Sequence, residues 1–276
     1  TLHLIQLNGR SSSMNVDFAR SEYGVEEIEA VYRVLERNWL ASGEENEQFE
    51  KEFANYVGTK HAICVNSGSS ANLLSLLALG LPKGTKVLTS SAGFPATISP
   101  ILHLGLSPLL VDYSLDTHNI NIEEVLRSLP NVKAVIFAHT MGVPVDMEPI
   151  IKKANELGVF VIEDCCEAVG AKYHGSSVGS FGDLGTFSFY PAHQITALGE
   201  GGMVVTDNEE LALKIKSLRD WGKIWNWNDT LGDKRTSFET NVDGIKYYPG
   251  YTYETVGFNM KLNEASCAFG REQLKN

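Results

Sequence analysis

One titratable side chain, His193, lies between a hydrophobic run and a cluster of glycines in the segment SFYPAHQITALGEGG, residues 188–202. Glycines at this density favour a backbone that bends tightly, because glycine adopts conformations that other residues avoid. A histidine can take up or release a proton near neutral pH. The segment contains no lysine. The pattern indicates a tightly bent segment around His193, and it raises the question of why a histidine stands there and not another base or nucleophile.

A second polar segment, NSGSSA at 66–71, lies between a predicted strand at 61–65 and a predicted helix at 71–79. The first N–H groups of a helix have no partner inside the helix, and with a permissive glycine and several hydroxyls they can bind an anion. The segment predicts a phosphate site. Serine is also a common helix cap, so the same residues fit a plain capping turn.

A third candidate follows an apolar run, where VIEDCCE places Glu163 and Asp164 at the end of a predicted strand. Ligands of open α/β sheets bind beyond the carboxyl ends of the strands. A carboxylate there can hold a cationic ring nitrogen. It can also cap a helix or anchor a loop, and this segment alone favours that second role.

These segments, with a further hydroxyl-rich run GTFS at 185–188, together fit a phosphorylated heteroaromatic cofactor. A dinucleotide site would need a GxGxxG followed by an acid, which the chain lacks. Pyridoxal phosphate (PLP) needs a phosphate site, a partner for its pyridinium nitrogen and a flat surface against its ring. Phe94, in GFPAT, is the candidate for that surface, and the alternative is a core aromatic residue at a strand end.

Short apolar strands alternate with amphipathic helices over most of the chain. Strands are expected at 61–65, 86–89, 108–112, 133–138, 159–164, 186–189 and 202–206, and helices at 24–38, 47–56, 71–79, 122–128, 147–157 and 209–219. This alternation predicts an α/β fold with a mostly parallel sheet covered by helices on both faces. Residues 222–255 lack periodicity and predict a long loop. A last helix is expected from Asn263 to Asn276.

The composition is that of a globular chain: 276 residues, 43% hydrophobic and 21% charged. The net charge of −11 argues against a nucleic-acid partner. No apolar run approaches the roughly 18 residues of a membrane span, and the N-terminus lacks a signal pattern. The cysteines form no CxxC and predict buried small side chains in a reduced, cytoplasmic protein: Cys64, Cys165, Cys166 and Cys267.

Six segments, in order along nearly the whole chain, resemble the DegT/DnrJ/EryC1/StrS sugar aminotransferase family: NSGSSANLL, AGFPATISP, VIEDCCEAVGAKYHG, GSFGDLGTFSFYPAH, EGGMVVT and VGFNMKLNEASCAFGREQL. The resemblance implies the large domain of the type I aminotransferase fold, with a mostly parallel seven-stranded sheet sandwiched by helices. It implies a helical segment at 1–56, a PLP-binding domain at 57–220 and a long active-site or oligomer loop at 221–260. Residues 261–276 would begin a connecting helix to a C-terminal small domain that is truncated here.

The resemblance also implies PLP or its pyridoxamine form (PMP) as the cofactor, and it assigns binding roles. Gly68, Ser69 and Ser188 would hold the phosphate. Asp164 would pair with the pyridine nitrogen and Glu167 would lie near the phenolic oxygen, while Phe94 would stack on the ring. Asn259 resembles an asparagine that reaches a neighbouring subunit's cofactor, which implies a homodimer with shared active sites.

At the position of His193 this family normally carries the lysine that forms a Schiff base with PLP. Histidine cannot form that bond, although it can still abstract a proton. The replacement resembles the sugar 3-dehydratase branch, in which PMP condenses with the C4 ketone of a nucleotide-linked 4-keto-6-deoxyhexose and the C3 hydroxyl is eliminated. The resemblance thus implies a lyase of deoxysugar and lipopolysaccharide O-antigen biosynthesis, with a nucleotide-sugar substrate and His193 as its base.

Two features depart from the branch that AHTMGVP and DCC resemble most, which acts on CDP-linked sugars. That branch carries a [2Fe–2S] cluster on cysteines just after the RDWG tract. Here RDWG at 219–222 is followed by no cysteine before Cys267, so we expect no cluster. The branch acting on GDP-linked sugars lacks the cluster and uses glutamate as amino donor, which fits better. There is also one more residue than usual between His193 and Glu200.

Two other functions stay open. A sugar aminotransferase that tolerates histidine is disfavoured because the nearest lysines, Lys172 and Lys214, lie outside the motif. A non-catalytic relative is disfavoured because Asp164, Ser188 and the NSGSSA segment are retained. The form of the bound cofactor, and its conversion by glutamate, would separate the three functions.

Overall fold

The computed structural model describes residues 19–224, 240–247 and 251–275, and its centre is a seven-stranded sheet of order β1-β9-β8-β5-β4-β2-β3. The strands are β1 (His61–Val65), β2 (Lys86–Ser90), β3 (Ser107–Val111), β4 (Ala134–Ala138), β5 (Phe160–Asp164), β8 (Leu184–Ser188) and β9 (Gly202–Thr206). In the part of this order that runs β8-β5-β4-β2-β3, each strand is parallel to the next, whereas β9 is antiparallel to both β1 and β8. The predicted seven-stranded, mostly parallel sheet is confirmed.

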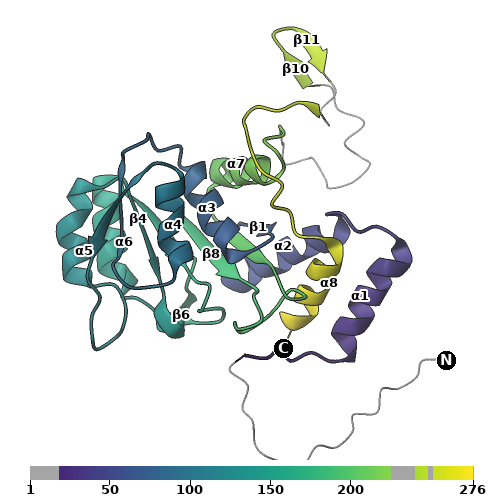
Figure 1. Cartoon of the computed structure of the whole chain (residues 1–276), viewed down its shortest axis with the longest axis horizontal. Helices are drawn as coiled ribbons and strands as arrows, with labels where there is room; N and C mark the ends of the chain where they lie inside the picture. Colours follow the sequence, from purple (N-terminus) through teal and green to yellow (C-terminus); the bar gives the residue numbers. More distant parts are fainter. Residues whose placement is uncertain (1–18, 225–239, 248–250, 276) are drawn as a thin grey trace, which may run out of the picture.

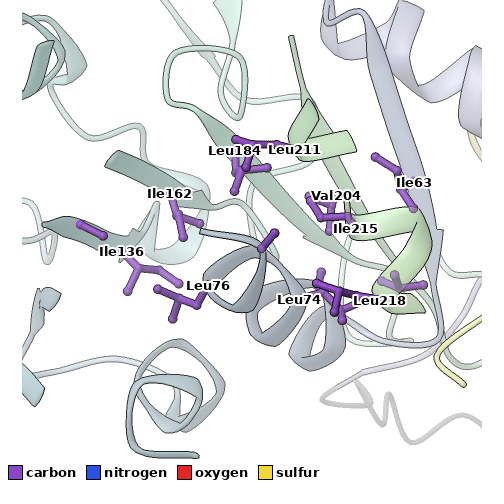
Figure 2. Close-up of a cluster of buried hydrophobic side chains, with 14 of the residues drawn as sticks. Ile63, Leu74, Leu76, Ile136, Ile162, Leu184, Val204, Leu211, Ile215 and Leu218 are labelled. Carbon is purple, nitrogen blue, oxygen red and sulfur yellow. The ribbon is translucent and has the colours of Figure 1, made fainter. Parts of the chain in front are cut away.

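Helices cover both faces of this sheet (Figure 1). On one face, α3 (Gly68–Ala78), α4 (Pro95–His103) and α7 (Glu209–Arg219) pack against apolar side chains of the strands. Figure 2 shows this cluster, which contains Leu74 of α3, Ile215 of α7 and strand residues such as Ile162. The other face is covered by α2 (Glu44–Val57), α5 (Ile122–Ser128), α6 (Met147–Leu157) and α8 (Glu264–Gln273).

Alternation along each strand explains the two cores. Ile136 of β4 and Ile162 of β5 face α3, whereas the adjacent Val135 and Val161 face α5 and α6. Strand side chains point to opposite faces in turn, so a strand buried on both faces is apolar throughout. The same parity decides where the polar residues at the strand ends point.

Three local features differ from the sequence predictions. Helix α4 was not predicted, because Pro95 at its first turn and Pro100 inside it interrupt the helical pattern; proline is compatible with the first turn, where its missing N–H is not needed. Residues 222–255 are not all loop, since β10 (Thr240–Val242) and β11 (Ile245–Tyr247) form a hairpin. Helix α8 ends at Gln273, so the expectation that it reaches Asn276 is wrong.

The remaining short elements are β6 (Lys172–Tyr173), β7 (Ser176–Ser177) and the 3₁₀ turns η1 (Leu129–Asn131) and η2 (Thr140–Gly142). Beside the sandwich, α1 (Val25–Arg37) packs on α8 through Ala30, Val34 and Ala268 (Figure 1). The predicted segment 1–56 and the loop 221–260 lie partly outside the described residues, and the division into domains stays a prediction. Among the described helices, none has both the length and the apolar character needed to cross a bilayer.

A buried ion pair ties α7 to α2 and β1. Arg219 is 1% exposed, and its Nη1 donates to Glu50 Oε1 at 2.5 Å and to the carbonyl of Cys64 at 2.7 Å. Glu50 Oε1 also accepts from the Cys64 N–H at 3.0 Å. Residues 50, 64 and 219 are thus joined although they are far apart in the chain, and this bridge fixes the end of α7 from which the RDWG tract continues.

Candidate active site

Polar side chains from two parallel strands gather at one edge of the sheet. Asp164 ends β5, Ser188 ends β8, and Thr186 lies opposite Asp164 in the register of the two strands. Because alternate residues share a face, all three lie on the side covered by α3 and α4. This edge is where ligands of α/β sheets bind.

The NSGSSA segment forms the turn from β1 into α3 at this same edge. Ser67 caps the helix, its Oγ accepting from the Ser70 N–H at 3.1 Å, so the capping interpretation is correct. Gly68 lies so close to its neighbours that a Cβ would stand 2.7 Å from Ser188 Cβ and 2.8 Å from Cys166 Sγ. Only glycine allows this approach, which brings the start of α3 against the hydroxyl-bearing end of β8.

Glycines after His193 serve a similar close approach. A Cβ on Gly202 would stand 2.4 Å from the carbonyl oxygen of Ser67 and 2.8 Å from the nitrogen of Gly68. Strand β9 therefore starts directly against the turn that precedes α3. Leu198 and Gly199 both adopt positive φ, of 58° and 101°, just before it. The tight bend that the glycine cluster predicted is present in the loop between β8 and β9.

Asp164 is 4% exposed and accepts three hydrogen bonds. Its Oδ2 accepts from Asn72 Nδ2 at 2.8 Å and from Thr97 Oγ1 at 2.7 Å, and its Oδ1 accepts from the Cys166 N–H at 3.2 Å. All three partners donate, and such a set matches a charged carboxylate. The Asp164 carboxylate is thus held at the strand end as a fixed acceptor, an arrangement suited to a cationic ring nitrogen.

Phe94 precedes α4 and is 71% exposed. The alternative that it is a core aromatic residue is therefore wrong. Its carbonyl accepts the Thr97 N–H at 3.1 Å, so Phe94 and the Asp164 partner Thr97 belong to one turn. Both also line a small hollow with Thr140 at the carboxyl edge of β2 and β4. The exposed ring is available to cover a planar ligand bound near Asp164.

His193 lies in the loop after β8, where its N–H donates to the carbonyl of Tyr190 at 2.9 Å. It is half-buried. Burial lowers the pKa of His193, and the charges of Glu167 and Asp164 partly oppose this shift. The imidazole is therefore mainly neutral at pH 7, and it lies within electrostatic range of both carboxylates.

Glu167 joins three parts of the site. Its Oε2 accepts from the Met141 N–H at 2.8 Å, and its carbonyl accepts from Gln194 Nε2 at 2.6 Å. The second bond ties the residue after His193 to the turn that follows β5. Cys166, which the sequence predicted to be a buried small side chain, is only half-buried; it lies in that turn against Gly68, and desolvation raises the pKa of its thiol well above the ordinary value.

Glu163 and His139 lie outside this site. His139 is fully buried; its Nδ1 accepts from the Val145 N–H at 3.0 Å, which leaves Nε2 protonated and donating to Glu163 Oε2 at 3.0 Å. Cys165 is close enough for the three to resemble a metal site. The hydrogen bonds already occupy the histidine nitrogens and the carboxylate, so we interpret the cluster as structural.

The remaining predicted residues lie near the turn before α3. Ser69 is exposed in the first turn of α3. Asn259 is also exposed, and its backbone forms an isolated antiparallel bridge with Asp220. The carbonyl of Met260, the next residue, accepts the Asn66 N–H at 2.9 Å. The Asn259 segment therefore runs beside the turn, and its reach toward a second subunit stays a prediction. Asn72, Thr97 and Thr186 were missed by sequence reasoning; polar residues within apolar stretches were the available signal.

The sequence model of the DegT/DnrJ/EryC1/StrS aminotransferase family matches residues 21–276. The lipopolysaccharide biosynthesis protein RfbH of Salmonella typhimurium is 38% identical over 265 residues, covering 91% of this chain and 60% of the relative. The dTDP-4-dehydro-2,6-dideoxy-D-glucose 3-dehydratase of Saccharopolyspora spinosa is 41% identical over 247 residues, covering 85% and 53%. The chain thus spans a little over half the length of these relatives.

Among solved structures, the GDP-4-keto-6-deoxy-D-mannose-3-dehydratase of E. coli with bound hydrated PLP matches with a TM-score of 0.85 and 32% identity. The match covers 95% of this chain and 67% of the other. The architecture is therefore that of a type I aminotransferase-like fold, as the sequence predicted.

Proposed function

This chain belongs to the DegT/DnrJ/EryC1/StrS aminotransferase family, and on that basis we propose that the protein is a 3-dehydratase of a nucleotide-linked 4-keto-6-deoxyhexose. Its cofactor is PLP in the PMP form, His193 is its base, and it serves deoxysugar and lipopolysaccharide biosynthesis. The observation that carries the proposal is the place of His193. This imidazole is half-buried in a loop that contains no lysine, the adjacent Gln194 donates to the Glu167 carbonyl, and the charges of Glu167 and Asp164 act on the pKa of His193.

The residues at the site fit this cofactor. The start of α3 at Gly68 and Ser69 offers unpaired N–H groups for the phosphate, and the Ser188 hydroxyl lies against it. Asp164, surrounded by donors, would hold the pyridinium nitrogen, and the exposed Phe94 ring would cover the cofactor ring. When bound, PMP supplies a primary amine for the C4 ketone and an electron-withdrawing ring that makes neighbouring C–H bonds acidic.

His193 then acts as the general base. Its lowered pKa keeps one imidazole nitrogen unprotonated at pH 7 and ready to take the proton from the cofactor's C4′ carbon. The imidazolium that forms is stabilised by the carboxylates of Glu167 and Asp164. The Gln194–Glu167 hydrogen bond would hold the His193 loop against the turn that follows β5.

The proposal includes no iron–sulfur cluster. Cys64, Cys165 and Cys267 are buried in the core, and Cys166 packs against Gly68. No cysteine follows the RDWG tract before Cys267. The pyridoxamine form is therefore regenerated by an amino donor, for which glutamate is the candidate. We also propose a homodimer in which Asn259 reaches the partner's cofactor.

The test uses the intact protein. PLP and glutamate are added first, and the absorbance spectrum is followed. CDP- or GDP-4-keto-6-deoxyhexose is then added, and the mass of the sugar product is determined by mass spectrometry. We expect conversion to the pyridoxamine form and a 3-deoxy sugar without nitrogen. An amino sugar would instead support the aminotransferase alternative. The absence of both spectral change and product would support a non-catalytic relative.

A further inference from the structure

Two buried side chains donate to Asp164, and a third buried side chain donates to one of them. Asn72 comes from α3, Thr97 from α4 and Thr186 from β8, and their exposed fractions are 0%, 6% and 0%. Asn72 and Thr97 both donate to Asp164 Oδ2, whereas Thr186 Oγ1 donates to Asn72 Oδ1 at 2.6 Å. The chain of hydrogen bonds therefore runs from Thr186 through Asn72 to Asp164.

The amide of Asn72 has only one orientation that suits its neighbours. Its Nδ2 donates one hydrogen to Asp164 Oδ2 and the other to the carbonyl of Ala96 at 3.1 Å. A flipped amide would set its oxygen against two acceptors, the carbonyl and the carboxylate. The Thr186 hydroxyl supplies the donor that the amide oxygen needs. Asn72 is thus fixed as a donor toward Asp164.

This arrangement also leaves one carboxylate oxygen for a ligand. Oδ2 takes the two short bonds, from Asn72 and Thr97, whereas Oδ1 takes the longer bond from the Cys166 N–H, at 3.2 Å. The Cys166 thiol also hydrogen-bonds to this carboxylate. A carboxylate oxygen can accept more than one hydrogen bond. Oδ1 is therefore the atom that remains able to receive a further donor.

We propose that Asn72, Thr97 and Thr186 are positioning residues that present Asp164 to the cofactor as a charged and oriented carboxylate, and so keep the pyridine nitrogen of the cofactor protonated. This inference rests on the proposed function, in which Asp164 is the partner of that nitrogen. A protonated ring withdraws electrons more strongly, so the three side chains act on the chemistry without touching the substrate.

The test measures the protonation of the ring directly. PLP labelled with ¹⁵N in the ring is bound to the intact protein, and its ¹⁵N chemical shift distinguishes pyridinium from neutral pyridine. In Thr97→Val, which replaces the hydroxyl with a methyl group, we expect a shift toward neutral pyridine and a PLP dissociation constant raised about tenfold, since a hydrogen bond to a charged group is lost. Thr186→Val should act in the same direction but less strongly, because the Ala96 carbonyl still orients Asn72.

Matched variants separate this role from simple packing. Thr97→Ser and Thr186→Ser keep the hydroxyls and should give the wild-type ¹⁵N shift. A merely structural role would lower the melting temperature of the valine variants and leave the ¹⁵N shift of bound PLP unchanged, which would overturn the inference. If Thr97→Val does not fold, Asn72→Leu replaces it: a leucine of similar size cannot donate to Asp164 Oδ2, so the ring should again shift toward neutral pyridine.

Asp164→Asn separates the inference from the proposed function. If this variant makes the ring neutral while Thr97→Val and Asn72→Leu leave it protonated, the positioning network is wrong and the role of Asp164 stands. If the ring stays protonated even in Asp164→Asn, the cofactor role of Asp164 is wrong, and the inference fails with it.

Discussion

Glu163 and Asp164 are consecutive residues of β5, yet their carboxylates serve opposite faces of the sheet. Glu163 accepts from the N–H groups of Gly179, Phe181 and Gly182 at 2.7–2.9 Å, as well as from His139. Asp164 turns instead toward α3 and α4. The first acid therefore anchors the loop before β8, and the second belongs to the candidate active site.

Glu163→Gln should reduce the stability of the fold. Glutamine retains the shape but loses the charge, and its amide nitrogen cannot accept from the backbone N–H groups that now point at it. We expect the free energy of unfolding to fall by about 3 kcal/mol in urea denaturation of the intact protein. Glu156→Gln, on the exposed side of α6, is the control and should change it by less than about 0.5 kcal/mol. Equal effects would contradict the anchoring role.

His193→Asn should remove the base and leave the cofactor site intact. Formation of the 3-deoxy product should fall about 10²- to 10⁴-fold, the usual contribution of general-base catalysis. The dissociation constant of PLP should change little, because the phosphate, ring and pyridine partners are elsewhere. Product formation at the wild-type rate would exclude His193 as the base.

Glu167→Gln should change the pH dependence of catalysis. Burial lowers the pKa of His193, and the Glu167 charge raises it. The base form is the neutral imidazole, so kcat/KM should fall on the acid side, with a midpoint below the ordinary histidine value of 6.5. Removing the Glu167 charge should move this acid limb to still lower pH. A shift to higher pH would mean that Glu167 does not act on His193 through its charge.

Gly68→Ala should damage the phosphate site. The new methyl group would stand 2.7 Å from Ser188 Cβ, so α3 or the end of β8 must move. We expect the PLP dissociation constant to rise about tenfold or more, measured by fluorescence titration. Gly58→Ala, at a positive φ of 89° with open space around it, is the matched control. That variant should lower stability and leave PLP affinity unchanged.

Arg219→Met should destabilise the protein because Glu50 loses its buried partner and retains only the Lys216 ammonium, 3.7 Å from Oε2. Breaking such a pair costs about 3–5 kcal/mol, to be measured by urea denaturation. Adding Glu50→Gln should recover part of the loss, since the second variant no longer buries a charge. Arg33→Met, whose side chain is 56% exposed, should change stability by less than about 1 kcal/mol. An Arg219→Met protein as stable as the wild type would show that the bridge contributes little.

Alternating apolar strands and helices were sufficient to predict the sheet. All seven of its strands were expected within a few residues of their observed bounds. A short, continuous apolar run such as AVIFA is typical of a strand that is buried on both faces of a sheet. Helix α4 was missed because Pro95 and Pro100 break the pattern that the prediction depends on. The hairpin β10–β11 was missed because its strands are only three residues long.

For the site, the sequence by itself determined the residue types. These are a turn at Gly68 that is typical of phosphate sites, the acid Asp164 at a strand end, and His193 at the position where the family that the chain resembles normally has a lysine. The strand-end pattern could not choose between Glu163 and Asp164, and only the family resemblance implied Asp164. That choice belongs to tertiary structure, because only the faces that α3, α4 and the 179–182 loop cover decide which carboxylate meets which donors. Asn72, Thr97 and Thr186 come from separate elements, and their hydrogen bonds to one another and to Asp164 exist only once the folded chain has brought those elements together.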